Sequence, residues 1–142
     1  MTDLPFLLGI QTDWQKKMMM KFGHGRAVSM DATHGTNIPN YLLWSLLVFD
    51  DWNNDILVTW VLASRSTKED LAMWLEPLRR HIEKDMPNFL PSCFMTDDAV
   101  EIRSALKRAW PEDNVPIYLY TFHIIKNWKN HILLKVPKIL EI

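Results

Sequence analysis

The chain has 142 residues, of which 48% are hydrophobic and 23% charged, and its formal net charge is −1. A chain of this length forms one domain with a real core, and its composition excludes a disordered or low-complexity protein. The near-neutral charge also argues against a dedicated nucleic-acid-binding domain, since such domains carry a clear excess of Lys and Arg.

The sequence contains no candidate for a membrane span, because no apolar run approaches the ~20 residues needed to cross a bilayer. An acidic Asp3 stands where a secretory signal would carry basic residues, and Cys93 is the single cysteine. We therefore expect an intracellular, reducing compartment.

The N-terminal segment 1–25 is predicted to be a helical lead-in to the domain. Residues 11–22 have a helical composition, Asp13 lies near the positive end of the expected helix dipole, and Gly23 and Gly25 end the helix.

Three strands are expected next, because runs rich in Val, Leu, Trp and Tyr favour extended structure. The segment 50–55 between the second and third runs consists largely of Asp and Asn, which predicts a hairpin between antiparallel strands. Turn formation is then the simplest role for its acidic residues. The expected strands are 26–31, 41–49 and 56–63.

A helix is predicted after Ser66, which forms a capping-box pattern with Glu69. Apolar residues recur at helical spacing beyond it, and Pro77 should kink the helix because it cannot donate a backbone hydrogen bond. The expected buried stripe is Leu71, Trp74, Leu75, Leu78 and Ile82.

The last part of the chain alternates strands and helices. Segment 92–96 is a short apolar run, and Asp98 with Glu101 forms a second capping pattern, so that a helix should run from there to Trp110. The resulting order βββαβαβα indicates an α/β domain with a mixed sheet over residues 26–142. Its final elements are a strand at 117–121 and a helix at 122–135.

The candidates for chemistry are carboxylates at strand ends. The sequence has no glycine-rich phosphate loop, paired-cysteine metal motif, nucleophile elbow or internal repeat. Asp31 and Asp97 each follow a predicted strand, and carboxylates from adjacent strands can bind hard divalent cations such as Mg²⁺. Two such cations support phosphodiester chemistry.

Each of these residues also has a simpler interpretation. A strand-end aspartate taken alone is more often a turn or cap residue, although Asp98 is the better cap and leaves Asp97 available for a metal. His123 at the start of a helix is more often structural, and Cys93 in an apolar run is most simply a packing residue. The four lysines between 126 and 138 suit a solvated helix face.

Several blocks of the sequence resemble the catalytic domain of Mutator-like element (MULE) transposases in the same order. The resemblance spans about Gln11 to Leu134. Its blocks are Ser29-Met-Asp-Ala-Thr-His-Gly-Thr-Asn37, Tyr41-Leu42, Leu47-Val-Phe-Asp50, Pro91-Ser-Cys-Phe-Met-Thr-Asp-Asp98 and Leu119-Tyr-Thr-Phe-His-Ile124.

The resemblance implies a ribonuclease H-like fold of the DDE type, with one aspartate on the first strand and a second after the fourth. Asp31 and Asp97 would be the first two members of an acidic triad, and His123 would be the motif histidine. The implied activity is DNA strand cleavage and transfer with Mg²⁺ or Mn²⁺. The implied partners are DNA in the nucleus and, in a homo-oligomer, a second copy of the chain.

Two departures from the family pattern bear on activity. Tyr120 stands at the position of a motif cysteine, and the third acidic residue of the family is expected beyond Ile142. The sequence also lacks a Cys/His cluster for the zinc modules, including the SWIM type, that accompany such transposases. A weak metal site and little strand transfer are therefore expected from this chain alone.

Three functions remain open from the sequence. The chain is the core of a transposase, or a domesticated nuclear relative that binds DNA and regulates transcription. The third alternative is a truncated gene product without autonomous function.

Overall fold

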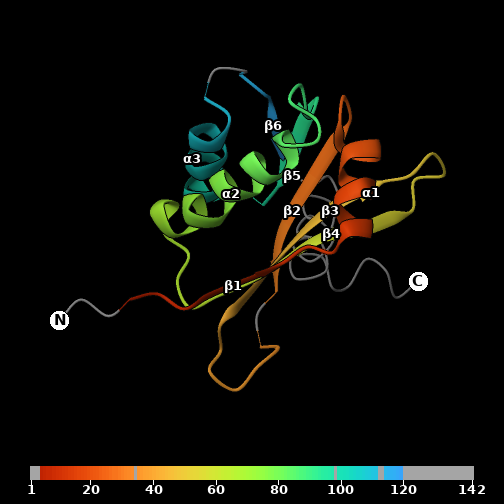
Figure 1. Cartoon of the computed structure of the whole chain (residues 1–142). Coiled ribbons are helices and arrows are strands. Elements are labelled where there is room, and N and C mark those ends of the chain that lie inside the picture. The colour runs from red at the N-terminus through yellow and green to blue at the C-terminus, as the bar shows by residue number, and fades with distance from the viewer. Residues whose placement is uncertain (1–3, 34, 98, 112–113, 120–142) are drawn as a thin grey trace, which may run out of the picture.

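The computed structural model describes residues 4–33, 35–97, 99–111 and 114–119 (Figure 1). Its centre is a six-stranded mixed sheet with the strand order β1-β4-β3-β2-β5-β6. The predicted mixed α/β class is confirmed. The strands are β1 (Leu7–Ile10), β2 (Ala27–Thr33), β3 (Leu42–Phe49), β4 (Asp55–Ala63), β5 (Cys93–Thr96) and β6 (Ile117–Leu119), and the helices are α1 (Asp13–Gly23), α2 (Lys68–Glu83) and α3 (Val100–Ala109).

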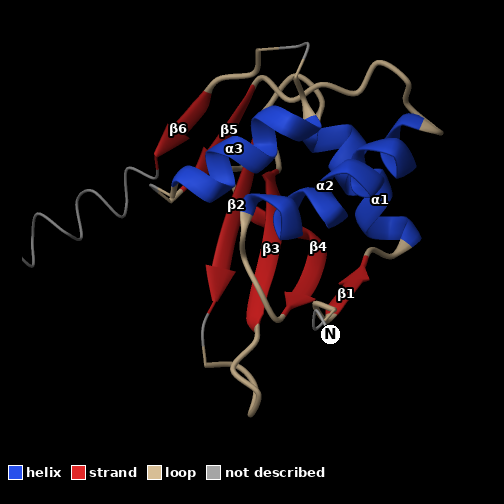
Figure 2. Ribbon diagram, turned by 90° about the vertical axis from the view of Figure 1, so that its left-hand side faces the viewer, coloured by secondary structure: helices blue, strands red, loops and turns tan. Residues whose placement is uncertain are grey.

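The three described helices cover one face of the sheet (Figure 2). Trp44 of β3 packs on Trp74 of α2 with ring centroids 6.5 Å apart, and Phe94 of β5 packs on Trp110 after α3 at 5.0 Å. Side chains alternate between the two faces along a strand. The neighbours of Trp44 and Phe94 in sequence therefore lie on the opposite face, which the described helices leave uncovered.

The core lies between the sheet and these helices. Burial in β3 alternates strictly, with every second residue buried on the helix side and the residues between them half-buried. The predicted apolar stripe of α2 is confirmed, because all five of its residues are buried. The fully buried large side chains include Met19, Met30, Leu46, Leu71, Leu75, Ile82 and Leu106.

The N-terminal segment contributes a strand that the sequence did not reveal, in addition to the predicted helix. β1 has only four residues and pairs antiparallel with β4 at the sheet edge. Gln11 follows it and donates from Nε2 to the carbonyl oxygen of Val58 (3.0 Å) and to Thr59 Oγ1 (2.9 Å). These bonds attach Gln11 to β4 at a β-bulge. The bulge is the point where the pairing of β4 with β3 shifts register, between Leu46 and Leu47 of β3.

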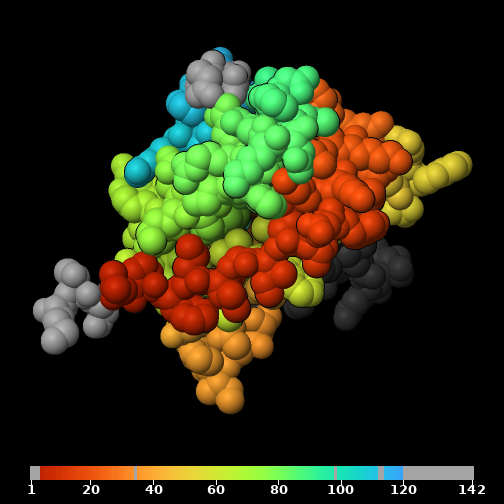
Figure 3. Space-filling view, viewed as in Figure 1, coloured from red at the N-terminus to blue at the C-terminus, as the bar shows by residue number. Residues whose placement is uncertain are grey.

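The predicted hairpin between β3 and β4 is confirmed. Asp50 Oδ1 accepts hydrogen bonds from the backbone N–H groups of Trp52 (2.9 Å) and Asn54 (2.8 Å), and Asn53 has a positive φ of 61°. These bonds, chiefly the backbone bond from Asn54, hold the pKa of Asp50 below its ordinary value. The hairpin projects from the body of the molecule (Figure 3), and its Trp52 is 85% exposed.

Both predicted helix caps are displaced by one residue. The N-cap of α2 is Thr67, whose side chain accepts from the backbone N–H of Asp70 while Asp70 accepts from the N–H of Thr67. The predicted Ser66 and Glu69 box is therefore wrong, because the residue with extended backbone geometry is Thr67, at ψ 163°.

α3 differs more strongly from its prediction. Its N-cap is Ala99, without a side-chain cap hydrogen bond, and the predicted cap Asp98 lies outside the described residues. The third helical position is consequently Ile102, which has no carboxylate to complete a capping box.

The assignment of Thr67 as the N-cap of α2 predicts that substitution of Thr67, and not of Ser66, lowers the stability of the protein. Thr67→Ala removes an acceptor for a helix N–H and a hydrogen-bond partner of the buried Asp70, and it should lower the free energy of unfolding by about 1–2 kcal/mol. Ser66→Ala is the matched control and should cost less than about 0.5 kcal/mol. Urea unfolding measures both changes, and equal losses would contradict the assignment.

The charge of Asp70 predicts a pH-dependent contribution. Burial alone would raise the pKa of this carboxyl, but the Thr67 hydroxyl and Arg65, at 3.1 Å, outweigh burial and lower it. A lowered pKa stabilises the fold above the unfolded value near ~3.9, and this contribution is lost as the pH falls below that value. Asp70→Asn should therefore be destabilised at pH 7 and approach the wild type below about pH 4 in thermal melts. A constant difference across this range would rule out the charge as the cause.

Candidate metal centre

The two predicted carboxylates belong to neighbouring parallel strands. β2 pairs with β5 in the register Ala27 with Cys93, Val28 with Phe94 and Ser29 with Met95. Two residues further along, this register leads to Asp31 on β2 and Asp97 directly after β5. The ladder itself ends at Ser29 and Met95, and because adjacent strands are about 4.8 Å apart, continuing its register puts the two predicted acids next to each other.

Asp31 lies inside its strand, because β2 continues to Thr33. The prediction that Asp31 follows the strand is therefore wrong. The strand extends past Asp31 because β2 stays paired with β3 up to the pair of Thr33 with Leu43. Asp31 alternates with the buried Met30, which belongs to the helix-side core. Its carboxylate is therefore on the face of the sheet that the described helices leave uncovered, named the helix-free face for that reason.

Asp97 is on the same face for the same reason. Phe94 and Thr96 are buried on the helix side, and Met95 and Asp97 alternate with them and are half-buried. The carbonyl oxygen of Asp97 accepts from Thr96 Oγ1 at 2.9 Å and from the N–H of Ala99 at 2.9 Å. These two bonds fix the backbone at the point where the chain leaves β5 and turns towards α3.

A third polar side chain is close to this pair. Ser45 of β3 is directly opposite Asp31 in the antiparallel ladder, so both side chains lie on the same face. The sequence analysis missed Ser45, although a serine within the apolar run Leu-Leu-Trp-Ser-Leu-Leu was a usable signal. Asp31 Oδ1 itself accepts from the N–H of Ala32 at 2.9 Å.

The donor set fits a hard divalent cation only in part. Carboxylate and hydroxyl oxygens are the ligands that Mg²⁺ and Mn²⁺ favour. Among the described residues no group of three or more His, Cys, Asp or Glu is placed to hold a metal ion. Two adjacent carboxylates repel each other when both are ionised, and a cation between them would relieve that repulsion.

The remaining predicted residues are placed as follows. His123, Tyr120 and the lysines between 126 and 138 lie outside the described residues. Cys93 is half-buried on β5, where it pairs with Ala27 in the parallel ladder. No described helix is long and apolar enough to cross a membrane.

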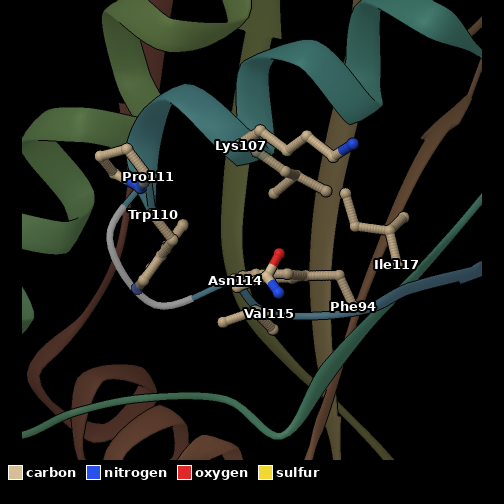
Figure 4. A pocket seen from close by; sticks show the side chains of 8 residues that line it. Phe94, Lys107, Trp110, Pro111, Asn114, Val115 and Ile117 are labelled. Atoms are coloured by element: carbon tan, nitrogen blue, oxygen red, sulfur yellow. The ribbon is translucent and has the colours of Figure 1, made fainter.

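The molecule also has a concavity lined by other residues, whose side chains Figure 4 shows. It has a volume of about 170 Å³ and lies between α3 and the strands β5 and β6. Neither Asp31 nor Asp97 lines it, and Phe94 places it on the helix side of the sheet. Its lining is mainly apolar, with Lys107 and Asn114 as polar exceptions.

The fold and this site can be compared with known proteins. The family model described as Zinc finger SWIM domain-containing protein 1/3, RNaseH-like domain, matches residues 6–116. The chain belongs to this family. The matched region runs from the residue before β1 to the residue before β6, and it includes both aspartates. The predicted ribonuclease H-like fold is thereby confirmed for this SWIM-family domain.

Other comparisons add little to this assignment. No curated protein matches the chain. A solved structure of Ciona intestinalis endonuclease V, the D234N variant in complex with a 23-mer DNA containing an inosine followed by a ribo-adenosine, is 14% identical with a TM-score of 0.34. The alignment covers 86% of the SWIM-family chain and 65% of the endonuclease chain. A likeness at this level does not establish a shared fold or function.

The acid pair predicts metal-dependent stabilisation. A cation that binds only the folded protein raises the melting temperature as its concentration passes the dissociation constant. Millimolar Mn²⁺ should therefore raise the melting temperature of the wild type, and Asp31→Asn or Asp97→Asn should abolish the rise. Asp51→Asn, in the projecting hairpin, is the matched control and should keep it. Equal responses in all four proteins would exclude a site at Asp31 and Asp97.

Proposed function

We propose that this domain carries out metal-dependent cleavage of DNA phosphodiester bonds and derives from a MULE-type transposase. The observation that carries the proposal is the register of β2 and β5, which leads to Asp31 and Asp97 side by side on one face. The family description joins an RNaseH-like domain to a SWIM zinc-finger protein, and SWIM fingers are among the modules that accompany MULE transposases. This combination supports the ancestry.

The carboxylates of Asp31 and Asp97 would hold the cation. When bound, Mg²⁺ or Mn²⁺ supplies positive charge that stabilises the attacking and leaving oxygens in phosphodiester cleavage. The Thr96 hydroxyl and the turn at Ala99 hold Asp97 in place. Ser45, opposite Asp31, can orient that carboxylate or a phosphate oxygen through its hydroxyl.

The expected activity of the 142-residue chain is weak. Two carboxylates give an incompletely enclosed site, and none of the described strands contains Lys or Arg to attract phosphate. We expect strand transfer to need a third acidic residue, which no group among the described residues supplies. DNA in the nucleus is the proposed partner, with a second copy of the chain as a possible member of the complex.

A second function, DNA binding without cleavage, is favoured because the described residues offer only two carboxylates as metal ligands at the site. A domain with a net charge of −1 and two carboxylates can retain the fold as a nuclear DNA-binding or transcription-regulatory module without cutting DNA. Binding through phosphates weakens steeply with salt, so gel shifts over a salt series identify this mode.

A nicking assay separates these functions. Supercoiled plasmid incubated with the chain in Mn²⁺ should be converted slowly to the nicked form, and Asp31→Asn or Asp97→Asn should reduce the rate at least ~100-fold because each removes a cation ligand. Asp51→Asn, in the exposed ion pair with Arg26, is the control and should cut at the wild-type rate. Nicking that survives in the Asp31 and Asp97 variants would show a contaminant. DNA binding without any nicking would favour the regulatory function.

A further inference from the structure

An exposed tryptophan shares a row of the sheet with the acid pair. Asp31 is opposite Ser45, and Ser45 is opposite Trp60 of β4. Residues directly opposite each other in antiparallel strands point to the same face, so the Trp60 ring is on the helix-free face. Two strand spacings of about 4.8 Å separate it from Asp31, or roughly 10 Å.

The exposure of Trp60 is unusual for its position. Its neighbours Thr59 and Val61 are buried on the helix side, whereas Trp60 keeps 44% of its surface exposed in the middle of a strand. An indole is among the most costly side chains to leave in water, because its burial removes a large apolar area. An exposed aromatic beside a candidate site is therefore a candidate ligand contact.

A second exposed ring lies on the other flank of the acid pair. Tyr118 of β6 is opposite Met95 in the parallel ladder and is 57% exposed. Met95 and Asp97 are two residues apart and share a face, so Tyr118 is on the helix-free face as well. The acid pair is thus flanked by an aromatic side chain on each side.

The charge of this face limits how it can hold DNA. The described strands contain no Lys or Arg, and the acid pair adds negative charge, so these strands cannot attract phosphate by themselves. Stacking of bases on aromatic side chains does not need positive charge and is the usual contact for unpaired strands.

We propose that Trp60 is a stacking platform for an unpaired base of the DNA strand that reaches Asp31 and Asp97, with Tyr118 as a second platform beyond them. This inference rests on the proposed function and narrows its substrate to single-stranded or locally unpaired DNA. Bases inside a duplex already stack on each other and do not present a free face to Trp60.

The test uses the whole chain and a fluorescein-labelled 12-nucleotide oligo-dT, measured by fluorescence anisotropy in EDTA. Trp60→Ala should weaken binding about 5- to 150-fold, the range for loss of one stacked base. Trp60→Phe retains an aromatic face and should recover most of the affinity. The exposed tryptophans Trp14 of α1 and Trp52 of the hairpin provide controls, and their Ala variants should bind like the wild type.

The second part of the experiment measures binding of an abasic 12-mer, which has the same length and charge as the oligo-dT but no bases. If Trp60 stacks on a base, Trp60→Ala should have no further effect on the already weaker binding of the abasic strand. An equal loss on both oligonucleotides would show that Trp60 acts through folding, and no loss on either would overturn the proposal. Melting temperatures of the Ala and Phe variants identify any unfolding.

These outcomes are separate from those of the nicking assay, because EDTA removes the cations on which cleavage depends. Base-dependent binding by Trp60 without nicking would leave the platform intact and reject the nuclease. Nicking by a protein whose Trp60→Ala variant binds oligo-dT normally would reject the platform alone. Duplex DNA bound as tightly as oligo-dT by the wild type would also contradict it.

Discussion

The parallel pairing of β2 with β5 is the interaction on which the candidate site depends. β2, β3 and β4 form an antiparallel meander, which moves the chain away from β2 one strand at a time. α2 then crosses the sheet and returns the chain to the free edge of β2, where β5 can pair in parallel. A shift of this register by one residue would turn Asp97 towards the buried side, because side chains alternate along a strand.

The two faces of the sheet have different roles in this arrangement. The described helices bury Trp44, Leu46 and Phe94 on one face, and this burial supplies the apolar area that stabilises the register. The opposite face carries the acid pair, Ser45 and the exposed rings of Trp60 and Tyr118. Substitutions on that face can therefore alter binding with little change in the helix-side core, which makes the proposed variants interpretable.

Much of the fold could be predicted from the sequence, since the hairpin, the stripe of α2 and the order of elements along the chain from β2 to β6 all follow from local patterns. β1 was missed because four residues at an edge carry no periodic signal, and the caps were displaced because neighbouring Ser, Thr, Asp and Glu satisfy the same pattern. The aspartates could be named, but Ser45 and Trp60 could not be linked to them. Ser45 and Trp60 come next to Asp31 only through the pairing of β3 with β2 and with β4. This pairing could not be predicted, because a continuous apolar run does not show which face of the sheet each of its residues takes.

The charge of the helix-free face determines how the proposed DNA substrate would approach the site. Two carboxylates in adjacent strands, without Lys or Arg in the described strands, form a locally negative surface that repels a phosphate backbone. In the proposed function, a divalent cation would neutralise these two carboxylates where the phosphate approaches, so that cation binding and DNA binding would reinforce each other. The proposed stacking on Trp60 would contribute affinity that does not depend on the cation. A DNA strand would then be held at the site before the metal is bound, and the metal would determine where along that strand cleavage occurs.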